Sequence, residues 1–396
     1  MSVSVPAVPG LRVAPEPDEI RVMVVDDAAV VRGLLSRWIE ETPGFRLVAA
    51  LRNGREALEQ LDQAKPDVVV LDVEMPELDG ISTLPKLLQR RRDLTVIMAS
   101  ALTRDHAEVT IKALSLGAAD YIPKPTTEGG VITSASFQRE LIEKIRALGT
   151  RRVKRPLTPH VRRAVNPALR RLGTSVQRTL KWRTVTTESD TTALKLRPFS
   201  PMPPRVLLIG SSTGGPQALS KMVTRLDAVT ESAPVLITQH MPPTFTTILA
   251  EHLSRAGGKP VREAVDGEPV LAGNVYLAPG GKHMMVARRD GTAVIVLDDS
   301  PPVHYCKPAV DPLFSSAADV WGSWVLALIL TGMGTDGTEG AADVVAAGGS
   351  VIAQDEATSV VWGMPGHAVA AGLCSAVLPL EQIAPKVSRL FLGART

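Results

Sequence analysis

Two stretches of the chain alternate short apolar runs with segments of helical periodicity. Between Glu19 and Thr126 the runs are R-V-M-V-V, D-V-V-V-L, L-T-V-I-M-A and A-D-Y-I-P. From Pro204 onward they are R-V-L-L-I, P-V-L-I-T, V-Y-L-A-P, A-V-I-V-L, W-V-L-A-L-I-L and S-V-I-A-Q. Unbroken Val, Ile and Leu runs of this length are typical of strands buried on both faces, and helices between them indicate a parallel sheet. The pattern therefore predicts two α/β domains.

The second domain carries one predicted exception to parallel pairing. The runs at Val275 and Ala293 lie close together along the chain. Two strands joined by a short connection commonly form an antiparallel hairpin. We therefore expect a hairpin on an otherwise parallel, doubly wound sheet.

The same pattern sets the expected domain limits. Residues 1–18 are rich in Pro, Val and Ala without periodicity and are predicted to be a disordered tail. Residues 19–148 form the first domain, with Val131 to Leu148 as its closing helix. Residues 149–203 are predicted to be a flexible linker, and residues 204–396 form the second domain.

The predicted linker is strongly basic. It contains R-R-V-K-R-P, H-V-R-R, L-R-R-L and K-W-R, with no acidic residue between Arg151 and Glu188. Such charge suits nucleic acid, membrane lipid or an acidic protein surface, but a solvated tether is the favoured interpretation. Since Trp182 is the linker's main aromatic residue, binding of single-stranded nucleic acid is not expected.

Composition narrows the class of protein. A chain of 396 residues is too long for one ordinary core, and its net charge of +3 conceals the basic linker. Its two cysteines argue against a disulfide framework or a thiolate metal cluster. The N-terminus lacks the features of a signal peptide, and the strongest apolar run, Trp324 to Leu330, is too short to span a bilayer. A cytoplasmic protein is expected.

Polar residues follow the strands of the first domain. Asp26 and Asp27 come after the first run, Asp72 after V-V-V-L, Ser100 after V-I-M-A and Lys124 after Y-I-P. The carboxyl ends of parallel strands meet at one edge of a sheet, where ligands bind. Any single Asp there is equally well explained as a helix N-cap, but the full set indicates a functional site.

Three crowded carboxylates favour a hard cation such as Mg²⁺, which prefers oxygen ligands. An aspartate at such a site can act as a nucleophile toward a phosphoryl group and form an aspartyl phosphate. The lysine would neutralise the incoming charge, and the Ser100 hydroxyl could sense it.

The motifs V-V-D-D, V-L-D-V-E-M-P-E-L-D-G, M-A-S-A and Y-I-P-K-P resemble the receiver domain of two-component response regulators. The resemblance implies a flavodoxin-like fold with a five-stranded parallel sheet, phosphorylated on Asp72. It implies that Mg²⁺ is held by Asp27, Asp72 and the backbone carbonyl of Glu74. It also implies that Asp26 belongs to the acidic pocket and that Ser100, Tyr121 and Lys124 are switch residues.

A glycine-rich hydroxyl turn, I-G-S-S-T-G-G, opens the second domain at Ile209 to Gly215. It lacks the Lys of a P-loop, the spacing of a dinucleotide fingerprint and the G-x-S-x-G of α/β hydrolases. What remains is a serine at a strand end, before a helix beginning near Pro216, where free N–H groups could stabilise an oxyanion. By itself, this motif fits a plain turn as well as a nucleophile.

Two further strand ends carry partners for a serine. His240 directly follows P-V-L-I-T-Q, and Asp336 lies in the glycine-rich segment T-G-M-G-T-D-G after W-V-L-A-L-I-L. The other histidines of the linker and the second domain fall in helical, hairpin, turn or linker patterns: His160, His252, His283, His304 and His367. Serine, histidine and aspartate at the exits of three strands favour an acyl-transfer site.

Five motifs of the second domain resemble the chemotaxis protein-glutamate methylesterase (CheB) family. They are I-G-S-S-T-G-G, T-Q-H-M-P-P, Y-L-A-P-G-G-K-H-M, L-T-G-M-G-T-D-G and I-A-Q-D-E-A-T-S-V-V-W-G-M-P. The resemblance implies Ser212 as nucleophile, His240 as base and Asp336 as orienting acid, with Thr213 and Met333 lining the site. From the residues alone, Ser211 competes with Ser212.

The resemblance also implies the activity and its partners. Members hydrolyse γ-glutamyl methyl esters on methyl-accepting chemoreceptors, release methanol, and in many cases deamidate receptor glutamines. Phosphorylation by the chemotaxis histidine kinase would activate the enzyme, with Mg²⁺ needed by the receiver and no cofactor for the esterase. No specific nucleic-acid partner is implied, and membranes would be reached only through receptors.

Two departures from the family pattern stand out. The receiver pocket has Ala28 where many members have Ser, and the linker is longer and more basic than usual. Two rival interpretations require other features. A DNA-binding response regulator would need a compact helix-turn-helix output, and a purely receptor-docking protein would not need Ser212, His240 and Asp336 together.

Overall fold

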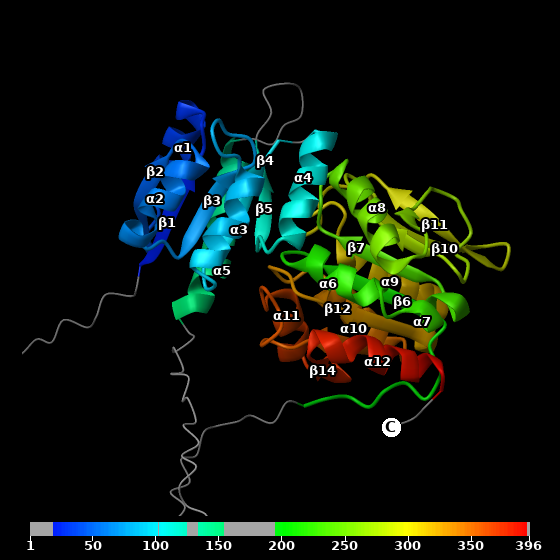
Figure 1. The fold of residues 1–396 in the computed structure, drawn as a ribbon. Helices are drawn as coiled ribbons and strands as arrows, with labels where there is room; N and C mark the ends of the chain where they lie inside the picture. The colour runs from blue at the N-terminus through cyan, green and yellow to red at the C-terminus, as the bar shows by residue number, and fades with distance from the viewer. Residues whose placement is uncertain (1–18, 102, 125–133, 154–194, 394–396) are drawn as a thin grey trace, which may run out of the picture.

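The computed structural model describes residues 19–101, 103–124, 134–153 and 195–393. The predicted tail 1–18 and most of the predicted linker 149–203 lie outside these residues. Two α/β domains lie side by side, the first coloured blue to teal and the second green to red (Figure 1).

The first domain is a five-stranded parallel sheet with strand order β2-β1-β3-β4-β5, which confirms the predicted receiver-like sheet. Its strands are β1 (Ile20–Val25), β2 (Phe45–Leu51), β3 (Val68–Asp72), β4 (Thr95–Ser100) and β5 (Asp120–Pro123). Its helices are α1 (Ala29–Glu40), α2 (Gly54–Ala64), α3 (Gly80–Arg90), α4 (Arg104–Ser115) and α5 (Ser134–Val153). The closing helix thus begins three residues later than predicted.

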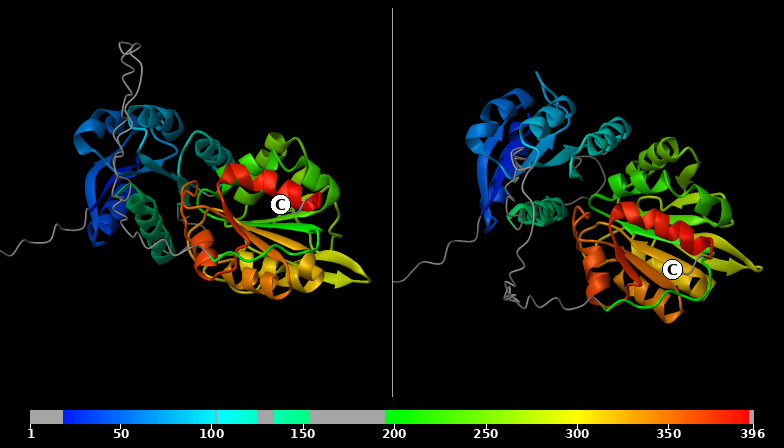
Figure 2. Two further views of the ribbon diagram at one scale, coloured as in Figure 1. Left: turned by 90° about the horizontal axis from the view of Figure 1, so that it is seen from below. Right: turned by 60° about the horizontal axis from the view of Figure 1, so that its bottom comes forward.

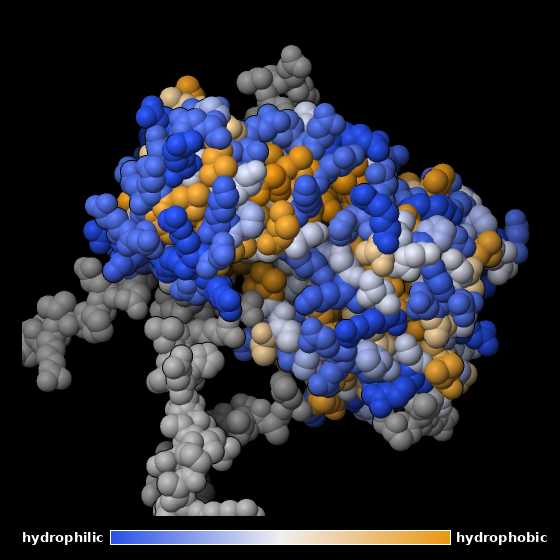
Figure 3. Space-filling model, in the orientation of Figure 1, coloured by the Kyte–Doolittle hydropathy of each residue, from blue (hydrophilic) through white to orange (hydrophobic). Residues whose placement is uncertain are grey.

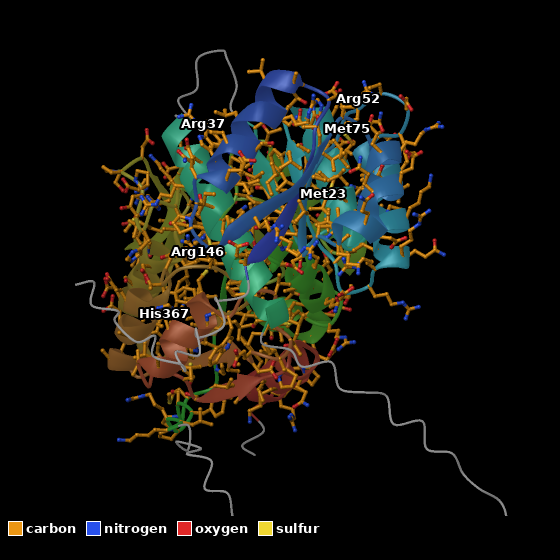
Figure 4. All side chains as sticks on the ribbon, turned by 90° about the vertical axis from the view of Figure 1, so that its left-hand side faces the viewer. Met23, Arg37, Arg52, Met75, Arg146 and His367 are labelled. Carbon is orange, nitrogen blue, oxygen red and sulfur yellow. The ribbon has the colours of Figure 1, made fainter. Side chains whose placement is uncertain are left out.

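Alternation along each strand divides the apolar residues of this domain between two faces. Met23 and Val25 pack with α2, α3 and α4, whereas Val22 and Val24 pack with α1 and α5. Successive strand side chains point to opposite faces, so a strand covered on both faces must be apolar throughout. Figure 4 shows Met23 within the sheet and the charged end of Arg37 at the surface.

The second domain has a seven-stranded parallel sheet in the order β14-β13-β12-β6-β7-β9-β8. Its strands are β6 (Val206–Ser211), β7 (Val235–Gln239), β8 (Val261–Glu263), β9 (Val275–Leu277), β12 (Val325–Ile329), β13 (Ser350–Gln354) and β14 (Ala376–Leu378). Its helices are α6 (Gly215–Val223), α7 (Asp227–Ser232), α8 (Phe245–Gly257), α9 (Val310–Trp321), the 3₁₀ turn η1 (Gly322–Trp324), α10 (Thr338–Ala346), α11 (Met364–Ala370) and α12 (Leu380–Phe391).

The chain leaves the central pair of this sheet in opposite directions. From β6 it continues to β7, and from β12 it continues to β13 on the other side. Because the two crossovers diverge, the carboxyl ends of β6 and β12 border a crevice, the usual ligand site of doubly wound sheets. The segments that follow these two strands are therefore the candidate ligand site.

The predicted hairpin was placed on the wrong strands. Val275 begins β9, which lies parallel between β7 and β8 in the main sheet. Ala293 belongs to β11 (Thr292–Asp298), which pairs antiparallel with β10 (His283–Arg289) as a separate two-stranded sheet. The pair is joined by Asp290–Gly291, both with positive φ, as a two-residue hairpin turn requires.

The two domains meet along α4 and β5 of the first and along α6 and α8 of the second. Helix α4 contacts both α6 and α8, and the further views show this side of the receiver facing the second domain (Figure 2). The visible surface of both domains is mainly hydrophilic (Figure 3). Within the described ranges, no helix is long and apolar enough to cross a bilayer.

Candidate active site

Three strand ends of the second domain converge on Ser212. The β6–β7 register pairs Ser211 with Gln239, and the His240 N–H donates to the Ser211 carbonyl at 3.1 Å. On the other side, the Ser212 N–H donates to the carbonyl of Thr331, just beyond β12, at 3.0 Å. The hydroxyl turn thus lies between the His240 segment and the segment that leads to Asp336, as the sequence predicted.

The two neighbouring serines differ in their surroundings. Ser211 is fully buried, and its hydroxyl donates to Oε1 of Gln239 at 2.7 Å. Ser212 is partly exposed at the sheet edge. The Ser211 hydroxyl is therefore held in the interior, and Ser212 is the more accessible of the two serines.

Gln239 is a positioning residue that the sequence analysis missed. Its Nε2 donates to the carbonyls of Ser212 and His240, at 3.0 and 3.2 Å, while its Oε1 accepts from Ser211. Its side chain thereby ties together the ends of β6 and β7. The only signal in the sequence was its place immediately before His240, which by itself does not show where an amide points.

His240 and Asp336 form a buried hydrogen-bonded pair. The His240 Nε2 lies 2.6 Å from Oδ2 of Asp336. The carboxylate also accepts backbone N–H groups of Val310 at 2.6 Å, Asp311 at 3.0 Å and Gly337 at 2.9 Å. Burial acts to raise the pKa of Asp336, but the bonds from His240 and from these N–H groups outweigh it and lower the pKa to about 2. The carboxylate is therefore charged and fixed in direction.

The other nitrogen of the imidazole does not face the serine. In the described part of the chain, no hydrogen bond joins the Ser212 hydroxyl to His240; the Nδ1 instead lies 3.3 Å from the Sγ of Cys306. Burial acts to lower the pKa of His240, whereas its contacts with Cys306 and Asp336 act to raise it. The sequence analysis gave Cys306 no role, because nothing in its local pattern placed it beside a strand end.

The segment after β12 packs directly against Ser212. A Cβ added at Gly332 would lie 2.9 Å from the Cβ of Ser212, so only glycine allows this approach. Met333 follows, partly buried. The Ser212 N–H is already bonded to Thr331, so an oxyanion at this turn would depend on the N–H groups that follow it and on the Met333 backbone.

Thr213, whose place in the site stays a prediction, contacts the other domain. Its hydroxyl donates to Oδ2 of Asp120, on β5, at 2.9 Å. Asp120 also pairs with Lys144 of α5 at 3.0 Å. One turn along α6, Gln217 Nε2 donates to the carbonyl of Ala118 at 2.8 Å. The receiver is thus hydrogen-bonded to the residue after Ser212.

A second contact of β5 reaches the segment after His240. The Tyr121 ring stacks on Phe245 with a centroid separation of 4.8 Å and an interplanar angle of 7°. Both side chains are buried. At the rim, Arg104 pairs with Glu251 at 2.9 Å. The structure thus places Tyr121, a predicted switch residue, within the interface.

The predicted acidic site of the receiver is assembled at its sheet edge. Lys124 Nζ lies 2.7 Å from Oδ2 of Asp26 and 2.8 Å from Oδ1 of Asp72. Oxygens of Asp26, Asp27 and Asp72 lie within 4.8 Å of one another. Burial raises the pKa of Asp72 to about 6, with Lys124 opposing and the two neighbouring aspartates adding to the rise. This all-oxygen, negatively charged donor set fits Mg²⁺.

The remaining receiver residues have separate partners. The Ser100 hydroxyl accepts from Thr110 of α4 at 2.8 Å. The side chain of Glu74 is exposed and lies 2.9 Å from Nε2 of His106. The predicted role of Glu74 as a carbonyl ligand stays a prediction.

Comparison with known proteins agrees with this organisation. Residues 22–135 match the response regulator receiver domain, and residues 207–387 match the CheB methylesterase domain. Over its whole length the chain is 57% identical to the full length of a protein of Rhodopseudomonas palustris named protein-glutamate methylesterase/protein-glutamine glutaminase of group 2 operon. A protein of the same name from Bradyrhizobium diazoefficiens is 57% identical, with 96% of each chain covered.

A solved structure, the Thermotoga maritima CheB methylesterase catalytic domain, is 42% identical over 48% of this chain and all of that one, with a TM-score of 0.46. The two full-length relatives match both domains and the segment between them. The chain therefore belongs to the family of protein-glutamate methylesterases/protein-glutamine glutaminases in which a response-regulator receiver domain precedes a CheB methylesterase domain.

Proposed function

We propose that this chain is a phosphorylation-activated esterase that hydrolyses glutamate γ-methyl esters on chemoreceptors, releasing methanol, and that it deamidates receptor glutamines. The observation that carries the proposal is the 2.6 Å bond between His240 and Asp336 beside the partly exposed Ser212. Full-length relatives carry both activities in their names.

In the proposed mechanism, Ser212, His240 and Asp336 each have one role. Ser212 Oγ attacks the ester carbonyl while His240 Nδ1 takes its proton, since Nε2 is occupied by Asp336. The imidazole must first exchange its contact with Cys306 for one with Ser212. Asp336 stabilises the imidazolium, N–H groups at the turn hold the oxyanion, and water then releases the acyl-enzyme.

Methanol release from methylated receptor membranes tests this proposal. We expect the whole chain to release methanol slowly alone and faster with acetyl phosphate and Mg²⁺. Ammonia release from receptors that carry glutamine at the same positions tests the deamidase. Intact methyl esters after prolonged incubation with phosphorylated protein would exclude the esterase.

The receiver is proposed to restrain this site. Its β5 residues Asp120 and Tyr121 hold the segments after Ser212 and His240, and α4 packs on α8. A receptor helix must reach Ser212, so these contacts have to open. The Ser100–Thr110 bond links the phosphorylation edge to α4, which gives added charge on Asp72 a path to the interface.

Removing the receiver should therefore raise the basal rate. A fragment of residues 195–396 keeps the seven-stranded sheet and every proposed catalytic residue. We expect its methanol release, without phosphodonor, to exceed that of the unphosphorylated whole chain by about tenfold or more. Domain contacts that stabilise the covered site by only about 1.4 kcal/mol already slow the reaction tenfold. A fragment as slow as the whole chain, yet folded by circular dichroism, would refute restraint by the receiver.

Asp72→Asn should remove activation without removing the basal rate. We propose that Asp27, Asp72 and the Glu74 carbonyl hold Mg²⁺, which would neutralise charge on the entering phosphoryl group. Acetyl phosphate with Mg²⁺ should then accelerate the unaltered chain but not the variant. Asp62→Asn, an exposed carboxylate on α2, is the matched control and should respond normally. Equal activation of Asp72→Asn would contradict the assignment.

The proposed partners follow from the two domains: a chemotaxis histidine kinase as phosphodonor and chemoreceptors as substrate, both in the cytoplasm. Membranes would be met only through receptors, and no cofactor is proposed for the esterase step. A DNA-binding role is not proposed, because the described part of the second domain is a sheet-based fold and not a helix-turn-helix module.

A further inference from the structure

Beside the proposed base lies a thiol that the esterase mechanism does not use. The Cys306 Sγ is 3.3 Å from Nδ1 of His240, whose Nε2 is 2.6 Å from Asp336. Sulfur, imidazole and carboxylate form one continuous chain, the order of groups that activates cysteine nucleophiles in hydrolases. The thiol is partly exposed, whereas the other cysteine of the chain, Cys374, is 2% exposed.

The thiol is held in place by a tight turn. The ends of the Val303–Cys306 turn exchange two backbone hydrogen bonds, of 2.8 and 3.1 Å. Its central residues, His304 and Tyr305, have φ of +48° and +64°, a region that non-glycine residues occupy only where surrounding contacts hold them. His304 pairs with Asp311 at 3.2 Å, and the Arg139 guanidinium of the receiver lies 4.0 Å from the Tyr305 ring centre.

The groups beside the sulfur offer a route for its proton. Transfer of the thiol proton to Nδ1 of His240 produces a thiolate beside an imidazolium, and Asp336 stabilises the imidazolium from the other side. A thiolate next to a histidine cation is the reactive state of a cysteine. The alternative, that the sulfur only fills space, does not account for its position on the one imidazole nitrogen that Asp336 leaves free.

We propose that Cys306 is a modification site for small uncharged electrophiles, and that its modification stops the esterase. With an alkyl halide the thiol proton passes to His240, sulfur forms a bond to carbon, the carbon–halogen bond breaks and halide leaves. The thioether then lies beside Nδ1 of His240, the atom that has to accept the Ser212 proton, and so blocks that transfer. This effect on activity rests on the proposed function, whereas the reactivity of the thiol does not.

Iodoacetamide on the whole chain tests the proposal, with peptide mass spectrometry reporting each cysteine separately. Cys306 should be carbamidomethylated at least about tenfold faster than glutathione at neutral pH, because His240 stands ready to take the thiol proton. Cys374 is the internal control, because burial raises its pKa to about 12. Labelling of Cys306 no faster than glutathione would overturn the proposal.

Variants separate reactivity from inhibition. His240→Gln should slow the labelling of Cys306 by about tenfold or more, since the proton acceptor is lost, whereas mere exposure would leave the rate unchanged. The Cys306→Ser variant should be as active an esterase after iodoacetamide treatment as before it. The Cys374→Ala variant should lose activity at the rate at which Cys306 is labelled. Complete labelling without loss of methanol release would overturn the inhibitory role. An untreated chain without esterase activity would refute the proposed function, and the labelling rates would still be measured.

Discussion

Replacing Ser212 with alanine is expected to reduce methanol release by roughly 10⁴-fold or more, the scale seen when a hydrolase loses its nucleophile. The residue is partly exposed and its backbone bond to Thr331 does not involve the hydroxyl, so the fold should be kept. The melting temperature should therefore change little while kcat collapses. Residual activity within tenfold of the unaltered chain would remove Ser212 from the proposed role.

Ser211→Ala is the matched control for this experiment. It deletes the same hydroxyl one residue earlier, where the side chain is buried and donates to Gln239. Leaving a buried acceptor without its donor costs about 1–3 kcal/mol, so this variant should melt at a lower temperature but keep most of its activity. The opposite result, with activity lost in Ser211→Ala and kept in Ser212→Ala, would assign the nucleophile to Ser211.

Replacing Asp336 with asparagine is expected to lower kcat by roughly 10³- to 10⁴-fold with little change in KM, since it affects the base and not substrate binding. The carboxylate accepts His240 Nε2 and three backbone N–H groups. An amide keeps the shape but turns one acceptor into a donor, and it no longer stabilises the imidazolium.

The same substitution should also lower stability. The amide nitrogen would face a donor at one of these bonds, which costs about 1–3 kcal/mol where the group is buried. Asp343→Asn is a suitable control, because this carboxylate lies exposed on the next helix, α10. Full activity in Asp336→Asn at its own optimum pH would show that His240 does not need this partner.

Both sheets were predicted with parallel strands because most of their buried strands contain a continuous apolar run, and such runs are visible without coordinates. The hairpin was misplaced because periodicity reveals strands but not their partners: Val275 and Ala293 have the same local pattern but lie in different sheets. The local signal for the correct pair, β10 with β11, was the Asp290–Gly291 dipeptide, which is typical of a two-residue hairpin turn.

The sequence by itself determined that Ser212, His240 and Asp336 follow strands whose carboxyl ends share one edge. Each residue comes after an apolar run of a parallel sheet, and all strands of such a sheet end at the same edge. Only the tertiary structure decided which nitrogen of His240 meets Asp336, that the other meets Cys306, and that Thr213 bonds to the receiver. Those contacts join residues 66 to 96 positions apart through side-chain rotamers and domain packing. Such choices depend on everything packed around each group, and no local pattern carries that information.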